Sequence, residues 1–177
     1  AKLIAPVIEE HLIDGYNWIV DILKGSKSNY HGVQSEIEIK KAVAFIKEKK
    51  IDQAIETLKA FEKKDKKMMA RASTNISFLY FLEGDYQASE KYADMALNYD
   101  KFNANALVNK GNCLFMKNDF LGAKENYLEA IGVTTDCVEA LYNLTLVNKK
   151  IGQYRDALTA LQKLQTILSN NPEVLYQ

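Results

Sequence analysis

The chain has 177 residues, and 47% of them are hydrophobic, so it can bury a sizeable core as one globular domain or one short repeat array. Its 23 Lys and Arg residues balance 23 Asp and Glu residues, which argues against a surface dedicated to nucleic acid, since such a surface needs a basic excess. The sequence has no signal-peptide pattern and no apolar run long enough to cross a bilayer, so we expect no membrane insertion. Cys113 and Cys137 are too few for a disulfide framework or a zinc site, and we expect reduced, buried thiols in an intracellular protein.

Residues 1–34 are predicted to form an amphipathic helix followed by a loop. Apolar side chains recur every three or four residues over residues 3–23 and therefore share one face of a helix. They are Ile4, Ile8, Leu12, Tyr16, Ile19 and Leu23. This stripe should pack against the next element or against a segment outside the chain. Trp18 and Val20 lie off the stripe, and we expect Trp18 to be a buried anchor. The stretch from Lys24 to Gln34 holds two Gly and two Ser and is predicted to be a loop.

The rest of the chain repeats with a fixed period. Residues 118–120 (Asn-Asp-Phe) correspond to residues 84–86 (Gly-Asp-Tyr) and to residues 152–154 (Gly-Gln-Tyr). The period is about 34 residues, a length typical of stacked helix-turn-helix units. We place the units at residues 35–69, 70–103, 104–137 and 138–171, with a truncated fifth unit at 172–177 that starts with Asn171 as N-cap and Pro172 in the first turn. The first unit is one residue longer, and we expect its surplus in a solvated turn from Glu62 to Lys67.

Small and large residues recur at fixed places in these units. Two helices approach closely only where one of them carries a small side chain, and the predicted crossing points are Ala54, Ser89, Ala123 and Ala157, with Gly111 on an opposing helix. The side chains expected to fill the turns are Ile51, Tyr86, Phe120 and Tyr154. Asp85 and Asp119 are predicted helix caps, and Gly84, Asn118 and Gly152 tolerate positive φ.

This pattern, with Gly111, Ala123, Tyr127 and Ala130 in their places, resembles the tetratricopeptide repeat over residues 35–171. Lys110 and Thr145 depart from the usual residues, and no repeat keeps the Trp of that family. The resemblance implies an all-α fold, a right-handed α-solenoid of tetratricopeptide-type helix-turn-helix repeats with a leading amphipathic helix.

Longer stretches across the whole chain resemble the tetratricopeptide subunits of the intraflagellar transport B complex. They are residues 4–10, 57–65, 106–112 and 139–143. This resemblance implies a non-catalytic protein–protein interaction scaffold, a core subunit of that complex needed for assembly of cilia and flagella. It implies no cofactor and no nucleic acid, other B-complex subunits as partners through extended peptide or helical segments, and a location in the cilium or flagellum, the basal body and the cytoplasm.

In tetratricopeptide arrays the first helix of each unit lines the concave side. A shift by one period then places Asn75, Asn109 and Asn143 in one row, and side-chain amides in a row can hold the backbone of a bound peptide. The other residues predicted in this groove are Phe78, Asn112, Phe115 and Tyr142. The alternative is that the Asn side chains are solvated or bonded to the next repeat, and that the rings belong to the core. We expect replacement of all three Asn by Ala to weaken peptide binding and to leave thermal unfolding nearly unchanged.

Other functions receive less support from the sequence. The carboxylate clamp of chaperone-binding repeats needs a Lys with an Asn one turn later, and the equivalent pairs Ile39 and Val43, Thr74 and Phe78, and Val108 and Asn112 do not match it. His11 and His31 form no metal or nucleophile pattern, and no Gly-rich phosphate loop is present. A peptide-binding adaptor of a chaperone or another complex, and the substrate-selecting array of a larger enzyme, remain as alternatives. An apolar end of the array would also favour self-association of the fragment.

Overall fold

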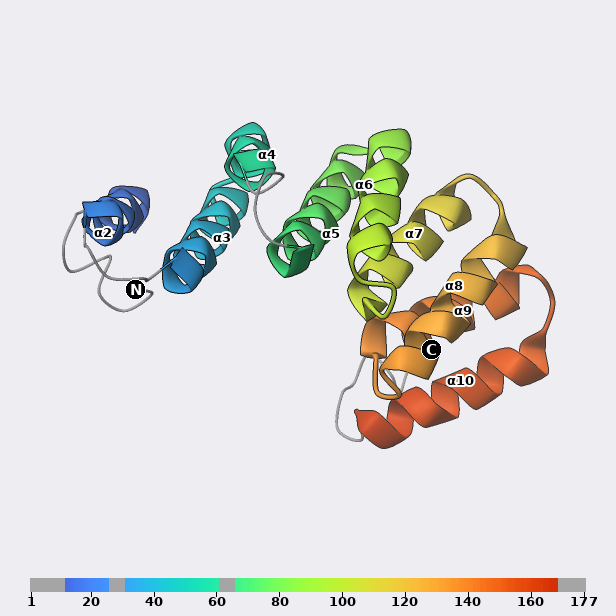
Figure 1. Cartoon of the computed structure of the whole chain (residues 1–177). Helices are drawn as coiled ribbons and strands as arrows, with labels where there is room; N and C mark the ends of the chain where they lie inside the picture. The colour runs from blue at the N-terminus through green and yellow to red at the C-terminus, as the bar shows by residue number, and fades with distance from the viewer. Residues whose placement is uncertain (1–11, 26–30, 61–65, 169–177) are drawn as a thin grey trace.

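The computed structural model describes residues 12–25, 31–60 and 66–168, and within these ranges it contains nine α-helices. They are α2 (Leu12–Gly25), α3 (His31–Lys47), α4 (Ile51–Lys59), α5 (Lys66–Glu83), α6 (Tyr86–Tyr99), α7 (Ala104–Met116), α8 (Phe120–Val133), α9 (Val138–Lys150) and α10 (Tyr154–Ile167). The helices follow one another along a curved array with α2 at one end and α10 at the other (Figure 1). The all-α repeat fold predicted from the sequence is therefore confirmed.

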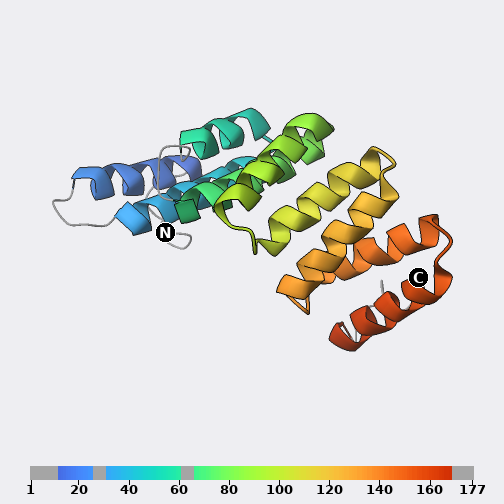
Figure 2. The ribbon, with the colours of Figure 1, turned by 45° about the vertical axis from the view of Figure 1, so that its right-hand side comes forward.

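Consecutive helices form hairpins, and the hairpins stack on one another. Helices α5 and α6, α7 and α8, and α9 and α10 pack as pairs, while α6 against α7 and α8 against α9 join one pair to the next (Figure 2). The first helices also touch, α5 against α7 and α7 against α9. This contact brings equivalent residues of three successive hairpins side by side, and it forms the wall on which the candidate site lies.

Close approach within the hairpins occurs at the small residues that the period predicts. Ala54, Ser89 and Ala123 are fully buried. Gly111 of α7 faces the ring of Tyr127 on α8, and a Cβ atom built on Gly111 would lie 2.6 Å from Cε1 of that ring. A contact this short excludes any side chain at residue 111 unless the buried ring moves.

Helix starts and turns also follow the sequence pattern. The Asp85 carboxylate accepts a hydrogen bond of 3.0 Å from the Ala88 amide, and the Asp119 carboxylate accepts one of 3.0 Å from the Gly122 amide, so both predicted caps are confirmed. Among the described residues, positive φ occurs at Gly84 with 82°, Gly152 with 78°, Asn118 with 64° and Lys49 with 59°. Lys49 was not predicted from the sequence, because the longer first unit moves it one position out of register with Gly84.

The turn-filling residues pair with rings of the preceding helix in two of the hairpins. Tyr86 lies 5.5 Å from Phe81 and Phe120 lies 5.3 Å from Phe115, measured between ring centroids. The same expectation is wrong for Tyr154, whose side chain is 70% exposed. Lys149 stands where the other two hairpins carry Phe81 and Phe115, so Tyr154 has no ring to pack against.

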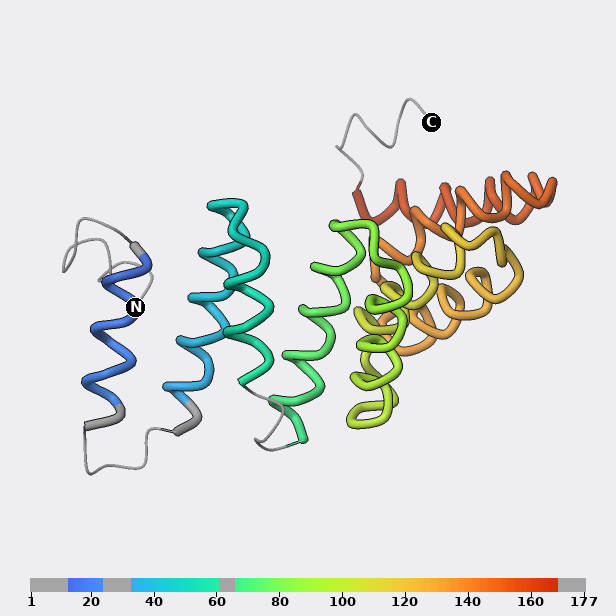
Figure 3. The backbone as a smooth tube through the Cα atoms, turned by 90° about the horizontal axis from the view of Figure 1, so that it is seen from above, coloured from blue at the N-terminus to red at the C-terminus, as the bar shows by residue number. Residues whose placement is uncertain are grey.

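The leading helix α2 packs on α3 of the first hairpin, as expected (Figure 3). The cluster between the two helices comprises Tyr16, Val20, Ile37 and Ala44. Val20 thus belongs to the buried face, whereas Trp18 is 46% exposed, so the prediction of a buried Trp18 is wrong. Two residues along a helix turn the side chain by roughly 200°, which places Trp18 on the side opposite Tyr16 and Val20.

Two predicted connections are shorter than expected. Helix α3 begins at His31, inside the loop predicted to run to Gln34, and α5 begins at Lys66, inside the turn predicted to run to Lys67. The predicted residues Ile4, Ile8, His11, Asn171 and Pro172 lie outside the described residues.

Candidate functional site: a groove across three hairpins

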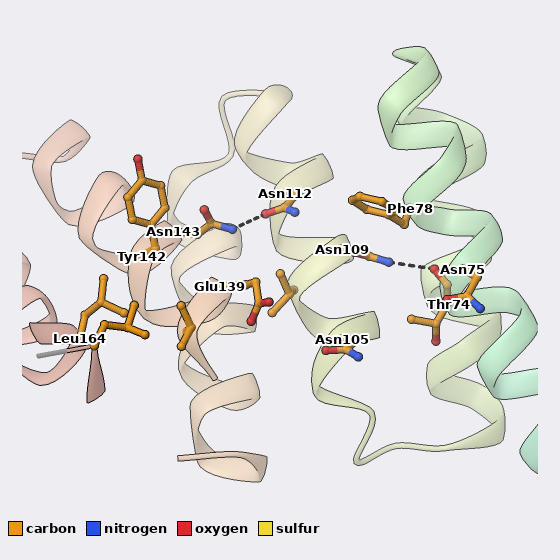
Figure 4. A pocket seen from close by; sticks show the side chains of 13 residues that line it. Thr74, Asn75, Phe78, Asn105, Asn109, Asn112, Glu139, Tyr142, Asn143 and Leu164 are labelled. Carbon is orange, nitrogen blue, oxygen red and sulfur yellow. Dashed lines mark hydrogen bonds between the residues drawn. The ribbon is translucent and has the colours of Figure 1, made fainter. Parts of the chain in front are cut away.

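A groove with a volume of about 650 Å³ runs across the first helices of three successive hairpins (Figure 4). Helices α5, α7 and α9 supply most of its surface, and Leu164 of α10 and Leu168 just after it lie at one end. The residues that line it are Thr74, Asn75, Phe78, Asn105, Val108, Asn109, Asn112, Val138, Glu139, Tyr142, Asn143, Leu164 and Leu168. Six of the seven residues predicted for the site are in this set.

The seventh predicted residue, Phe115, lies outside this groove. It lines an adjoining hollow of about 180 Å³, together with Phe81, Met116 and Leu146 among others, and this hollow shares Asn112 and Asn143 with the groove. Its ring packs edge-on against Phe120 at the turn between α7 and α8. Phe115 therefore contributes to the packing of its own hairpin, and its contact with a bound peptide stays a prediction.

The row of Asn75, Asn109 and Asn143 exists, but its members have different roles. Asn109 is 7% exposed, and its amide nitrogen donates a hydrogen bond of 3.0 Å to the backbone carbonyl of Thr74 in the preceding hairpin (Figure 4). This bond joins α7 to α5. The triple Ala replacement would therefore remove a buried inter-repeat bond, and the expectation of nearly unchanged unfolding does not fit Asn109.

Asn112 lies at the centre of a second polar link between hairpins. Its side-chain oxygen accepts hydrogen bonds from the Tyr127 hydroxyl at 2.7 Å and from the Asn143 amide nitrogen at 2.8 Å. Burial raises the pKa of Tyr127, so this hydroxyl keeps its proton and remains a donor. The chain of bonds connects α8, α7 and α9. Asn143 is thus held in place by its neighbour, with its amide at the groove wall.

Two aromatic side chains are the main apolar surfaces open to a ligand. Phe78 of α5 is 44% exposed and Tyr142 of α9 is 36% exposed, and both line the groove from opposite ends (Figure 4). Val108 of α7 is buried between them and forms part of the floor. Exposed rings beside amide groups provide the mixture of apolar contact and hydrogen bonding that peptide grooves use.

Asn105 and Glu139 line the groove but were not predicted from the sequence. They are one period apart, so they occupy equivalent positions on α7 and α9, and both are exposed. The same shift that aligned the Asn row could have found them. The end formed by Leu164 and Leu168 had no such signal, because it depends on how α10 lies against α9.

Both cysteines are free and buried. The Cys113 thiol donates a hydrogen bond of 3.0 Å to the Ser89 hydroxyl, and burial raises the pKa of Cys113. A thiol in this environment is protonated and poorly nucleophilic. Among the described residues, no group of three or more His, Cys, Asp or Glu side chains is placed to hold a metal ion. None of the helices in the described ranges is both long and apolar enough to span a bilayer.

Comparison with solved structures places the fold. Two crystal structures of MamA superpose on the chain with TM-scores of 0.69 and 0.66, at 20% and 18% sequence identity. The first covers 90% of this chain and 88% of MamA, and the second covers 95% and 86%. With the fixed period and the paired helices, this match makes the chain a tetratricopeptide-type helical repeat protein.

Comparison of sequences identifies a different relative. Over 103 residues, 58% of this chain, it is 44% identical to the human intraflagellar transport protein 88 homolog, of which the match covers 12%. The chain thus spans a small part of that relative's length. No protein-family model matches the chain.

Proposed function

We propose that the chain is a non-catalytic scaffold segment of an intraflagellar transport B complex and binds segments of other subunits in the groove across α5, α7 and α9. The observation that carries the proposal is the 44% identity over 103 residues with the human intraflagellar transport protein 88 homolog. On this proposal the chain acts in the cilium or flagellum, at the basal body and in the cytoplasm, and it contributes to assembly of cilia.

The groove supports peptide binding through its shape and lining. Its volume of about 650 Å³ lies within the range of about 300 to 1,000 Å³ that ligand sites occupy. Asn75 and Asn105 are polar and at least partly exposed, and Phe78 and Tyr142 present apolar rings. A bound segment could therefore place its backbone on the amides and its apolar side chains on the rings. Among the described residues that line the groove itself, none is Lys or Arg, so its lining does not match the carboxylate clamp of chaperone-binding repeats.

The experiment is affinity capture of the tagged chain from ciliated cells, followed by mass spectrometry. The wild-type chain should recover other B-complex subunits. Phe78→Asp should remove most of that recovery, because it places a charge on an exposed apolar surface of the groove.

Leu128→Asp is the matched control. Leu128 is exposed to a similar degree to Phe78, but it lies on α8 and outside the groove. We expect it to leave recovery unchanged. Capture that contains no other B-complex subunit would contradict the assignment to this complex. Equal recovery with both variants would instead place the binding surface outside the groove.

A further inference from the structure

One row of residues along the array changes charge from one hairpin to the next. Arg71 of α5, Asn105 of α7 and Glu139 of α9 are spaced by one period and therefore occupy the same position in three successive first helices. All three are exposed. The row thus runs from a cation through a neutral amide to an anion, along the direction in which the groove crosses the hairpins.

Glu139 is the one carboxylate among the described residues that line the groove. It lies one helical turn from Tyr142, since residues three apart on a helix are neighbours on its surface. The Cys137 thiol donates to Oε2 of Glu139 at 3.9 Å, a contact too weak and long to satisfy a carboxylate.

Arg71 extends the row past the opposite end of the groove. It is exposed on the same helix as the groove residues Thr74 and Phe78, and Thr74 is three residues further along that helix. Adjacent packed helices lie about 8 to 10 Å apart, so two steps along the row separate Arg71 from Glu139 by roughly 16 to 20 Å. An extended segment covers this length with about five or six residues, at roughly 3.3 Å per residue.

From these observations we infer that the groove selects a segment of opposite polarity: a Lys or Arg at the α9 end, an acidic residue at the α5 end about five or six positions away, and apolar side chains between them. The apolar side chains contact Phe78 and Tyr142, and the two charges meet Arg71 and Glu139. The inference rests on the proposed function, because it specifies which segments the groove accepts. The row of Arg71, Asn105 and Glu139 determines the direction in which the segment lies in the groove.

The probe is a phage-displayed library of random 12-residue peptides, selected on the purified chain. Peptides from the wild type should carry basic and acidic residues at the stated separation and in one preferred order. Binding of such a peptide should weaken about tenfold in Glu139→Lys, because an attractive pair becomes a repulsive one. The exchanged variant Arg71→Glu with Glu139→Lys should select peptides with the opposite order of charges. Glu129→Lys is the matched control, since Glu129 is exposed on α8 outside the groove, and it should change neither the affinity nor the order.

Two results would overturn the inference and separate it from the proposed function. In the first, the selected peptides bind Phe78→Ala more weakly than the wild type but bind Glu139→Lys as tightly. The groove would then not select its occupant by charge, and the proposed function would stand. Failure to recover any peptide whose binding depends on Phe78 would overturn the inference, and the capture experiment would then decide the proposed function by itself.

Discussion

The hairpin of α7 and α8 and the hairpin of α9 and α10 share a backbone plan but differ at the positions that determine packing. The hairpin of α7 and α8, the third, has Gly111 opposite Tyr127. The hairpin of α9 and α10, the fourth, has Thr145 and Leu161 at the same two positions. The third hairpin thus combines the smallest residue with a large ring, whereas the fourth combines two residues of intermediate size. The comparison teaches that the repeat accepts different residue pairs at this crossing, since the second hairpin carries the small residues Ser77 and Ala93 there.

Further differences leave the fourth hairpin with fewer stabilising contacts. Where the third has Leu114, Phe115 and the cap Asp119, the fourth has Asn148, Lys149 and Gln153. The side-chain oxygen of Asn148 is buried without a hydrogen-bond partner, and Gln153 makes no side-chain cap bond. We therefore expect the fourth hairpin to be the less stable of the two.

The largest effect is expected at the close contact of the third hairpin. Gly111→Thr should lower the free energy of unfolding by about 2 to 3 kcal/mol, since its Cβ would overlap the buried Tyr127 ring. Adding Tyr127→Leu reproduces the pair of the fourth hairpin and should recover part of this loss. Urea unfolding followed by circular dichroism measures both.

Gly132→Ala is the control for that substitution. Gly132 is exposed in α8, and a Cβ there would meet nothing within 4 Å. A gain of about 0.5 kcal/mol is expected from the better helix propensity of Ala. If Gly111→Thr were as stable as the wild type, the close contact would not limit the third hairpin.

A smaller effect of opposite sign is expected at the buried amide of the fourth hairpin. Asn148→Leu copies Leu114 and removes a buried acceptor that has no partner, so it should raise the free energy of unfolding by about 1 to 2 kcal/mol. Thermal and urea unfolding both report the change. Destabilisation by this substitution would mean that the Asn148 amide is needed where it lies.

The helix caps should differ by about 1 kcal/mol between the hairpins. Asp119→Ala removes the bond to the Gly122 amide and should destabilise by about that amount, whereas Gln153→Asp supplies the missing cap to α10 and should stabilise by a similar amount. Hydrogen exchange at the first turns of α8 and α10 would localise the two changes. Opposite changes from those stated would show that the caps do not account for the difference.

The smallest change concerns the turn between α9 and α10. Lys149→Phe restores the ring pair found in the two preceding hairpins and should stabilise the chain by about 0.5 to 1 kcal/mol, with less exposure of Tyr154. Iodide should quench the tyrosine fluorescence of this variant less than that of the wild type, since one of the ten Tyr side chains becomes less exposed. Unchanged quenching would count against the pairing.

The sequence predicts the features of this molecule that recur with its period. Helix pairs, the caps Asp85 and Asp119, the contact at Gly111 and six of the groove residues all follow from the shift by one period. The features that the sequence fails to predict each depend on one neighbouring residue. Trp18 is exposed because Val20 takes the buried face, and Tyr154 is exposed because its partner position holds Lys149.

The repeat period also does not predict the hydrogen bonds of the groove amides. Asn109 and Asn143 align with Asn75, but their bonds to the Thr74 carbonyl and to Asn112 depend on the side-chain geometry between adjacent helices. An aligned row therefore predicts position, and the role of each member must come from the structure.

Site-specific photo-crosslinking in ciliated cells is the most direct test of the claim that the groove is the surface of the scaffold that binds its partners. A photoreactive phenylalanine analogue at Tyr142, inside the groove, should crosslink the chain to another subunit of the B complex. The same analogue at Leu128, exposed on α8 outside the groove, should not. Crosslinks to such a subunit from Leu128 and none from Tyr142 would contradict the account.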